Sequence, residues 1–295
     1  MGYLFLLISL FAGPLKGYCG KKTSGYTGSI GNAVFANTIR MLLCILIGFL
    51  LILTTEELHI LIPTPSLLLI AALSGVSSAV FVVTWLISVK KSAYMMLDIF
   101  LMLGVLIPSI ASSIFFGESI APTQWVGIGV LFLAVMIMCS YNNTIKARLT
   151  LPSLILLLIC GIANGIADFS QKLFTKCVLN GSAMAFNFYT YVFAALVLMG
   201  AYATTRKSDP NTEKADLKKI FGYILIMALC LFANSYFKTL AAGYLSAVLL
   251  YPLNQGCALI LSAIMSAALF KEKLTLKAII GMITAFAGLL IINLL

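Results

Sequence analysis

The chain has 295 residues, of which 62% are hydrophobic and only 9% are charged. A soluble domain carries about 25% charged residues, so this chain lacks the polar surface to face water on all sides. Its formal net charge of +10 would suit nucleic-acid binding in a soluble protein, but the basic residues lie mostly in short segments between apolar runs, which favours a membrane protein with no nucleic-acid partner.

Ten apolar stretches are long enough to be transmembrane helices, which need roughly 20 residues each. They predict an all-α integral membrane protein whose surroundings are the lipid bilayer. The first stretch is the weakest, because Pro14 and Lys16 interrupt it. In chain order the predicted spans are 2–20, 31–53, 66–89, 92–115, 121–141, 152–173, 183–204, 219–241, 244–269 and 275–294.

The chain repeats itself. The stretch "FFGESIAPTQWVGIGV" at 115–130 is similar to "LFKEKLTLKAIIGMIT" at 269–284. At one constant shift, Phe116, Glu118, Gly127 and Phe132 recur as Phe270, Glu272, Gly281 and Phe286. The pattern predicts a first five-helix repeat at 1–141, a linker at 142–151 and a second five-helix repeat at 152–295.

The odd number of spans in each repeat has a physical consequence. A half that crosses the membrane five times leaves the chain on the opposite side, so the second half enters upside down. Two similar halves in opposite orientation form an inverted repeat around a central cavity, as in secondary transporters.

These features resemble the EamA-type branch of the drug/metabolite transporter superfamily, including "NTIRMLLCILIGFLL" at 37–51 in the second span. The resemblance implies a secondary carrier of the bacterial cytoplasmic membrane. Such carriers move amino acids, metabolites or drug-like compounds by alternating access. The family usually has a proline near the start of its fourth and ninth helices. Here Pro252 matches, whereas Asp98 stands at the equivalent place in the first half.

Ionisable residues within spans are costly and point to a partner or a polar cavity. Asp98 and Asp168 are expected to line the cavity and to bind a cationic group or a coupling proton. In the alternative, Arg40 neutralises one of them, and Lys172 or the interface solvates the other. For Arg40 a structural or gating role is favoured over a substrate contact. Lys238 is expected to reach the interface with its ammonium group.

Uncharged residues complete the candidate site. Asn164 lies one turn before Asp168 on the same helix face, and Gly161 and Gly165 would allow a close helix approach or a local bend there. Each polar side chain serves either the solute or an interhelical hydrogen bond. The remaining candidates are Asn37, Tyr94, Asn187, Tyr191, Asn234, Tyr251, Asn254 and Gln255.

Other chemistries find little support. Glu118 and Glu272 are expected to cap or to charge the first turn of the helices that follow them, not to act as a catalytic pair. The seven cysteines form no CxxC and His59 is the one histidine, so neither a metal site nor a cofactor is expected. No GxxxxGK[ST] occurs, which argues against ATP hydrolysis.

The leading hypothesis is a secondary transporter of a small organic solute, with a proton as the candidate coupling ion. A broad multidrug or toxic-cation exporter is the alternative within transport. A non-transporting scaffold and an intramembrane enzyme are less favoured. The sequence leaves a monomer and a homodimer equally open. Most of the 19 basic residues follow odd-numbered spans, which would place both termini outside, whereas the family resemblance implies cytoplasmic termini.

Overall fold

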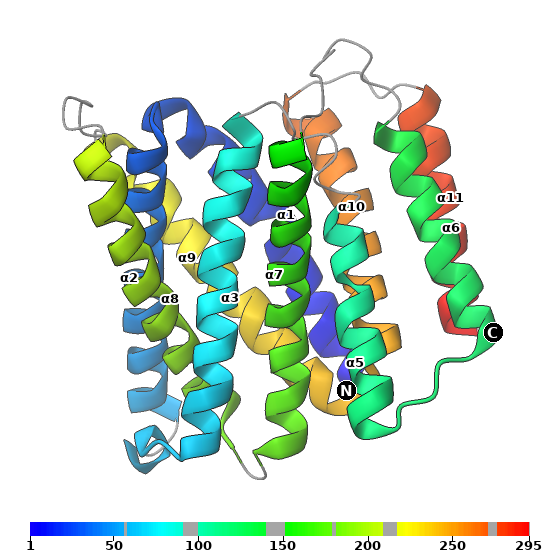
Figure 1. The fold of residues 1–295 in the computed structure, drawn as a ribbon, viewed down its shortest axis with the longest axis horizontal. Coiled ribbons are helices and arrows are strands. Elements are labelled where there is room, and N and C mark those ends of the chain that lie inside the picture. Colours follow the sequence, from blue (N-terminus) through cyan, green and yellow to red (C-terminus); the bar gives the residue numbers. More distant parts are fainter. Residues whose placement is uncertain are drawn as a thin grey trace. The chain divides into compact units, whose positions relative to one another are not determined.

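The computed structural model describes residues 1–55, 58–90, 100–139, 151–178, 181–208, 217–270 and 276–294. All regular structure in these ranges is helical (Figure 1). Residues 100–104 are helical and lead through a turn at Val105 into α5. The elements are α1 (Gly2–Thr27), α2 (Ile30–Thr55), η1 (Leu58–Leu61), α3 (Pro65–Lys90), α5 (Leu106–Phe116), α6 (Pro122–Cys139), α7 (Leu151–Cys177), α8 (Ala183–Ser208), α9 (Leu217–Tyr244), α10 (Ala247–Phe270) and α11 (Leu276–Leu294).

The helices have the length and the surface of membrane spans. Within the described ranges, six of them are long and apolar enough to cross a bilayer, and the others include shorter apolar helices. Large apolar side chains such as Leu69 and Ile114 are 73% and 72% exposed. Such surface is unfavourable in water but suits contact with lipid. The chain is therefore a multi-pass all-α membrane protein, as predicted.

Several helices are longer than their predicted apolar spans. The first predicted span ends at residue 20, but α1 continues to Thr27 and so includes Lys22, which lies beyond that span. Helix α7 likewise continues to Cys177. Hydrophobicity marks the part of a helix that lies in hydrocarbon, whereas the hydrogen-bonded helix extends beyond it.

One compact unit, unit 1, consists of Met1–Ile87 and Ser170–Tyr244. In it α1 packs along α9, and α2 packs against α8 and α9 (Figure 1). Gly75 of α3 lies so close to α8 that a Cβ there would be 2.5 Å from the Thr190 carbonyl oxygen. The α3–α8 crossing therefore depends on a residue without a side chain.

The second unit, unit 2, consists of Ser88–Phe169 and Leu245–Leu295. In it α6 packs along α11, and α10 contacts α5, α6 and α11 (Figure 1). A Cβ on Gly127 of α6 would lie 2.9 Å from the carbonyl oxygen of Gly288 on α11. Each unit thus combines segments from before and after the linker, so the units cut across the predicted sequence repeats.

The turn after α5 uses both residues of its Gly-Glu pair. Gly117 ends the helix with a φ of +66° and donates its N–H to the Ser113 carbonyl, while the Glu118 N–H donates to the Ser112 carbonyl. The Glu118 carboxylate accepts the N–H of Ala247, the first residue of α10, at 2.7 Å. Glu118, which was predicted to serve the helix that follows it, thus caps a helix 129 residues away. Glu272 lies outside the described residues.

Glu118→Ala is expected to destabilise the protein by about 1–2 kcal/mol, because it removes an anionic acceptor from the first turn of α10. Glu118→Gln keeps an acceptor oxygen and should cost less. Thermal unfolding of the detergent-solubilised protein measures both. Equal melting temperatures for the wild type and the Ala variant would show that the contact carries no stability.

Candidate functional site

Arg40 lies in the first half of α2 and is only 8% exposed. Its guanidinium is within electrostatic range of Cys44, one turn later, and of Tyr191 on α8. Among the described residues its Nε atom has no hydrogen-bond partner. The structure therefore places a cation inside the helix packing of unit 1.

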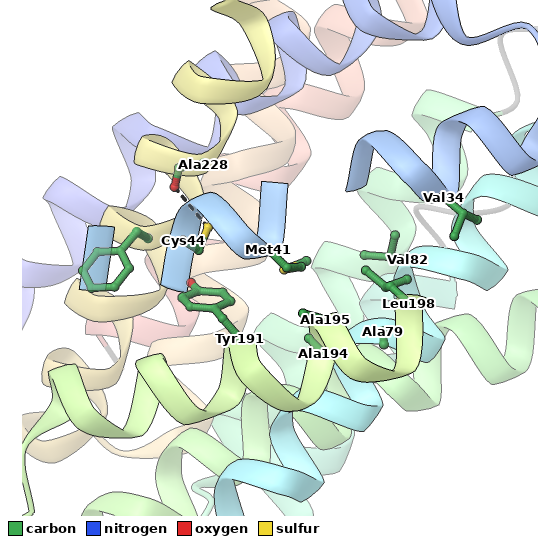
Figure 2. Close-up of a cluster of buried hydrophobic side chains, with 11 residues drawn as sticks. Val34, Met41, Cys44, Ala79, Val82, Tyr191, Ala194, Ala195, Leu198 and Ala228 are labelled. Atoms are coloured by element: carbon green, nitrogen blue, oxygen red, sulfur yellow. Dashed lines mark hydrogen bonds between the residues drawn. The ribbon is translucent and has the colours of Figure 1, made fainter. Parts of the chain in front are cut away.

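The surroundings of Arg40 are mainly apolar. Met41 and Cys44 of α2 face Tyr191 of α8, and the Cys44 thiol donates to the Ala228 carbonyl of α9 at 3.4 Å (Figure 2). The Tyr191 hydroxyl donates to the Leu231 carbonyl at 3.2 Å. The two side chains within electrostatic range of the cation thus come from α2 and α8, and each is hydrogen-bonded to the backbone of α9.

A polar network continues from Tyr191 between α7, α8 and α9. The Ser235 hydroxyl interacts with Tyr191 and donates to the Asn187 side-chain carbonyl. Gln171 donates its amide to Ser235 at 3.3 Å, while its own Oε1 is buried with no partner among the described residues. Asn187 also donates to Thr239 at 3.4 Å. Two predicted residues, Tyr191 and Asn187, are therefore linked through Ser235.

Ser235→Ala is expected to cost about 1 kcal/mol, because it leaves the Gln171 amide and the Asn187 carbonyl without their shared partner. Thermal unfolding measures the loss. Thr54→Ala is a matched control, since Thr54 is exposed and bonds only carbonyls of its own helix. A Ser235 variant as stable as the control would show that the network does not hold the helices.

Two other predicted residues in unit 1 use their amides in hydrogen bonds to helix backbone, one within its own helix and one between helices. Asn37 donates to the Ala33 carbonyl, one turn earlier on α2, at 2.7 Å. Asn234 donates to the carbonyl and the hydroxyl of Ser9 on α1, at 2.8 and 2.9 Å. The Asn234–Ser9 pair joins the long α1–α9 contact. Its geometry is that of an interhelical hydrogen bond.

Lys172 is a buried cation that sequence reasoning did not rank as a site residue. It is 2% exposed and donates its ammonium to the Ala242 carbonyl, in the last turn of α9, at 3.0 Å. A cation there is favoured by the helix dipole. The signal in the sequence was its position four residues after Asp168, well inside a helix that continues beyond the predicted span.

In unit 2 the structure brings Asp168 and Tyr251 together. Asp168 is 6% exposed and Tyr251 only 1%. The Tyr251 hydroxyl donates to the backbone carbonyl of Asp168 at 2.6 Å, which ties α10 to α7 at that residue. Asn164 is half-buried one turn before Asp168. Tyr94 and Asp98 lie outside the described residues.

The other predicted residues of unit 2 lie on α10, one turn after Tyr251. Asn254 and Gln255 are both half-buried. The Asn254 Oδ1 atom is buried with no hydrogen-bond partner among the residues that the structure describes. This helix therefore presents an unused acceptor close to the Tyr251–Asp168 contact.

The glycines near Asp168 make a close helix crossing, as predicted. A Cβ on Gly161 would meet the carbonyl oxygen of Phe100, and one on Gly165 would meet that of Gly104. A Cβ on Gly104 would in turn meet the carbonyl oxygen of Gly161. Small residues spaced four apart let two membrane helices touch through their backbones. This crossing fixes the position of Asp168 relative to the helical residues 100–104.

The buried charges and amides of the two units can bind ions and hydrogen-bonding groups. In the described part of the chain, no group of three His, Cys, Asp or Glu residues is gathered that could hold a metal ion. The polar groups of unit 1 centre on Arg40 and those of unit 2 on Asp168.

Known proteins give two likenesses. Residues 151–294 match the model of the EamA-like transporter family. A solved structure described as "Crystal structure of protein" aligns over 99% of this chain and 96% of its own chain, with a TM-score of 0.78 and 11% sequence identity. At that identity the likeness concerns the fold alone. No curated protein matches the sequence.

Proposed function

Because residues 151–294 place this chain in the EamA-like transporter family, we propose that it is a secondary active transporter. It would move a small organic solute across the cytoplasmic membrane by alternating access. Members of that family are transporters rather than enzymes. The observation that carries the proposal for this chain is the burial of Arg40, Asp168 and Lys172 inside apolar helices. Ionisable groups in such places mark binding sites and ion pathways.

The transport cycle would rest on an inverted repeat. We propose ten transmembrane helices in two five-helix repeats, 1–141 and 152–295, joined by the linker at 142–151. The recurrence of Phe-x-Glu before the last helix of each half supports this division. Two similar halves of opposite orientation can pack in two nearly equivalent ways, each open to one side of the membrane.

Asp98 and Asp168 are the proposed sites for a cationic group or a coupling proton. A carboxylate in this role must change its protonation or its partner during the cycle. The hydroxyl of Tyr251 holds the backbone at Asp168, which supports a fixed position for the carboxylate. Asn164, Asn254 and Gln255 would add neutral hydrogen-bonding groups around it.

Proteoliposomes test whether the chain is a carrier at all. They are loaded with the small-molecule extract of cells grown on uniformly ¹⁴C-labelled glucose, and the retained compounds are resolved after incubation without ATP. We expect selective loss of a few compounds compared with protein-free liposomes. Equal retention of every compound in both preparations would count against transport.

We propose that both termini face the outside, because most basic residues follow odd-numbered spans. A reporter enzyme active only outside the cytoplasm, fused after residue 295, measures the orientation. Activity of the fusion supports the charge bias. An inactive fusion together with an active cytoplasmic reporter at the same place would establish the opposite orientation.

A further inference from the structure

The guanidinium of Arg40 has no acidic partner in the helices of its own unit. Helices α1, α2, α3, α8 and α9 contain neither Asp nor Glu, and neither does the 170–177 part of α7. The acidic residues of unit 1 all fall in segments outside the described residues. They are Glu56, Glu57, Asp209, Glu213 and Asp216.

The positive charge of Arg40 also cannot be removed by deprotonation. Arginine stays protonated in proteins, unlike a buried lysine, which can lose its proton. Arg40 is more than nine-tenths buried, and its Nε–H finds no acceptor among the described residues. The two side chains within electrostatic range of its guanidinium, Cys44 and Tyr191, are a thiol and a phenol rather than carboxylates. A buried cation of this kind needs a counter-ion.

A second cation approaches the same place. Cys44 lies within electrostatic range of both Arg40 and Lys16, which come from α2 and α1. Two basic residues, from helices that contact each other, therefore both act electrostatically on one buried thiol. Such an arrangement attracts an anion and disfavours a cationic solute.

We propose that the counter-ion of Arg40 is supplied by the solute, and that this solute is a small organic monoanion with a carboxylate. A guanidinium binds a carboxylate through two parallel hydrogen bonds. The desolvation cost of an ion rises with the square of its charge, so a doubly charged phosphate ester fits less well than a carboxylate. The apolar side chains around Arg40 suit the hydrocarbon remainder of such an acid. The inference rests on the proposed transport function.

The first test measures the melting temperature of the protein with no organic anion present. In buffer without organic anions, Arg40→Met should melt at a higher temperature than the wild type, because it removes an uncompensated buried charge. Arg206→Met is the matched control: Arg206 is exposed on α8 and donates to the Tyr202 hydroxyl at 2.7 Å. It should melt close to the wild type. An Arg40→Met variant that melts lower than the wild type would overturn the proposal, because an acidic residue of the chain would then be left unpaired.

The second test adds probes to the same three proteins: acetate, hexanoate and 3-phenylpropanoate, then 3-phenylpropanamide, 3-phenylpropylamine and phenyl phosphate. At least one carboxylate should raise the melting temperature of the wild type and of Arg206→Met. Its affinity for Arg40→Met should be on the order of a hundredfold weaker. The proposal is overturned if no carboxylate raises the melting temperature of the wild type, or if the Arg40 variant responds equally. It is also overturned if the amine or the phosphate raises the melting temperature of the wild type and the carboxylates do not.

Flux separates this inference from the transport proposal. If a carboxylate binds in a way that depends on Arg40 but does not cross the membrane of proteoliposomes, the anion site is supported and the transport proposal fails. If other solutes cross the membrane and their flux is unchanged in Arg40→Met, the transport proposal is supported and the anion site fails.

Discussion

Asp168→Asn is expected to abolish solute flux in proteoliposomes while the protein is still produced and folded. The amide keeps the size of the carboxylate but can neither carry a proton nor balance a cation. A charged group inside a membrane helix costs about 2.5–3.5 kcal/mol on insertion, a cost that the neutral amide avoids. The hydrogen bond from Tyr251 goes to the backbone of Asp168 and is kept in the variant.

Glu118→Gln is the matched acid-to-amide control for this variant. It changes a carboxylate in the same unit that caps α10 in a turn, away from the apolar helix interiors. Flux should persist in it. If Asp168→Asn transports like the wild type at every pH tested, Asp168 carries neither the coupling proton nor the solute.

Gly161→Ala is expected to lower the free energy of unfolding by about 3 kcal/mol. Any Cβ at this position would run into the carbonyl oxygen of Phe100, which is backbone and has no rotamer with which to move away. The two helices would have to separate, and the contacts of Gly104 and Gly165 would be lost with that movement. Thermal or chemical unfolding of the purified protein measures the change.

Gly200→Ala provides the control, because a Cβ on Gly200 of α8 would have no atom of another residue within 4 Å. Alanine also favours helix over glycine, so this variant should be as stable as the wild type or slightly more stable. Equal melting temperatures for the two alanine variants would mean that the crossing at Gly161 is looser than the structure shows.

Much of the architecture could be predicted because it depends on local composition. Long apolar runs indicate membrane helices whatever surrounds them, and the Gly161–Gly165 spacing indicates a close crossing without naming its partner. The Gly-Glu turn after α5 was likewise visible in the sequence. What the sequence left open was the partner of Glu118, because a cap from 129 residues away depends on how the helices pack.

The polar site was predicted less completely, for the same reason. Tyr191 and Asn187 were singled out by residue type, but Ser235, Gln171 and Thr239, which complete their network, are ordinary residues until the helices are placed. Lys172 was considered only as a group that could solvate one of the two aspartates, because the predicted span ends at residue 173 whereas α7 continues to Cys177. Its bond to the end of α9 required the fold.

The most direct test of the transporter proposal is movement of a solute against its own gradient. Proteoliposomes are prepared with one ¹⁴C-labelled compound, chosen from those lost in the extract experiment, at equal concentration on both sides. A pH gradient is then imposed without ATP. A carrier coupled to protons should build up a concentration difference that disappears with a protonophore and in Asp168→Asn. Equal concentrations on both sides, with and without the gradient, would contradict proton-coupled transport.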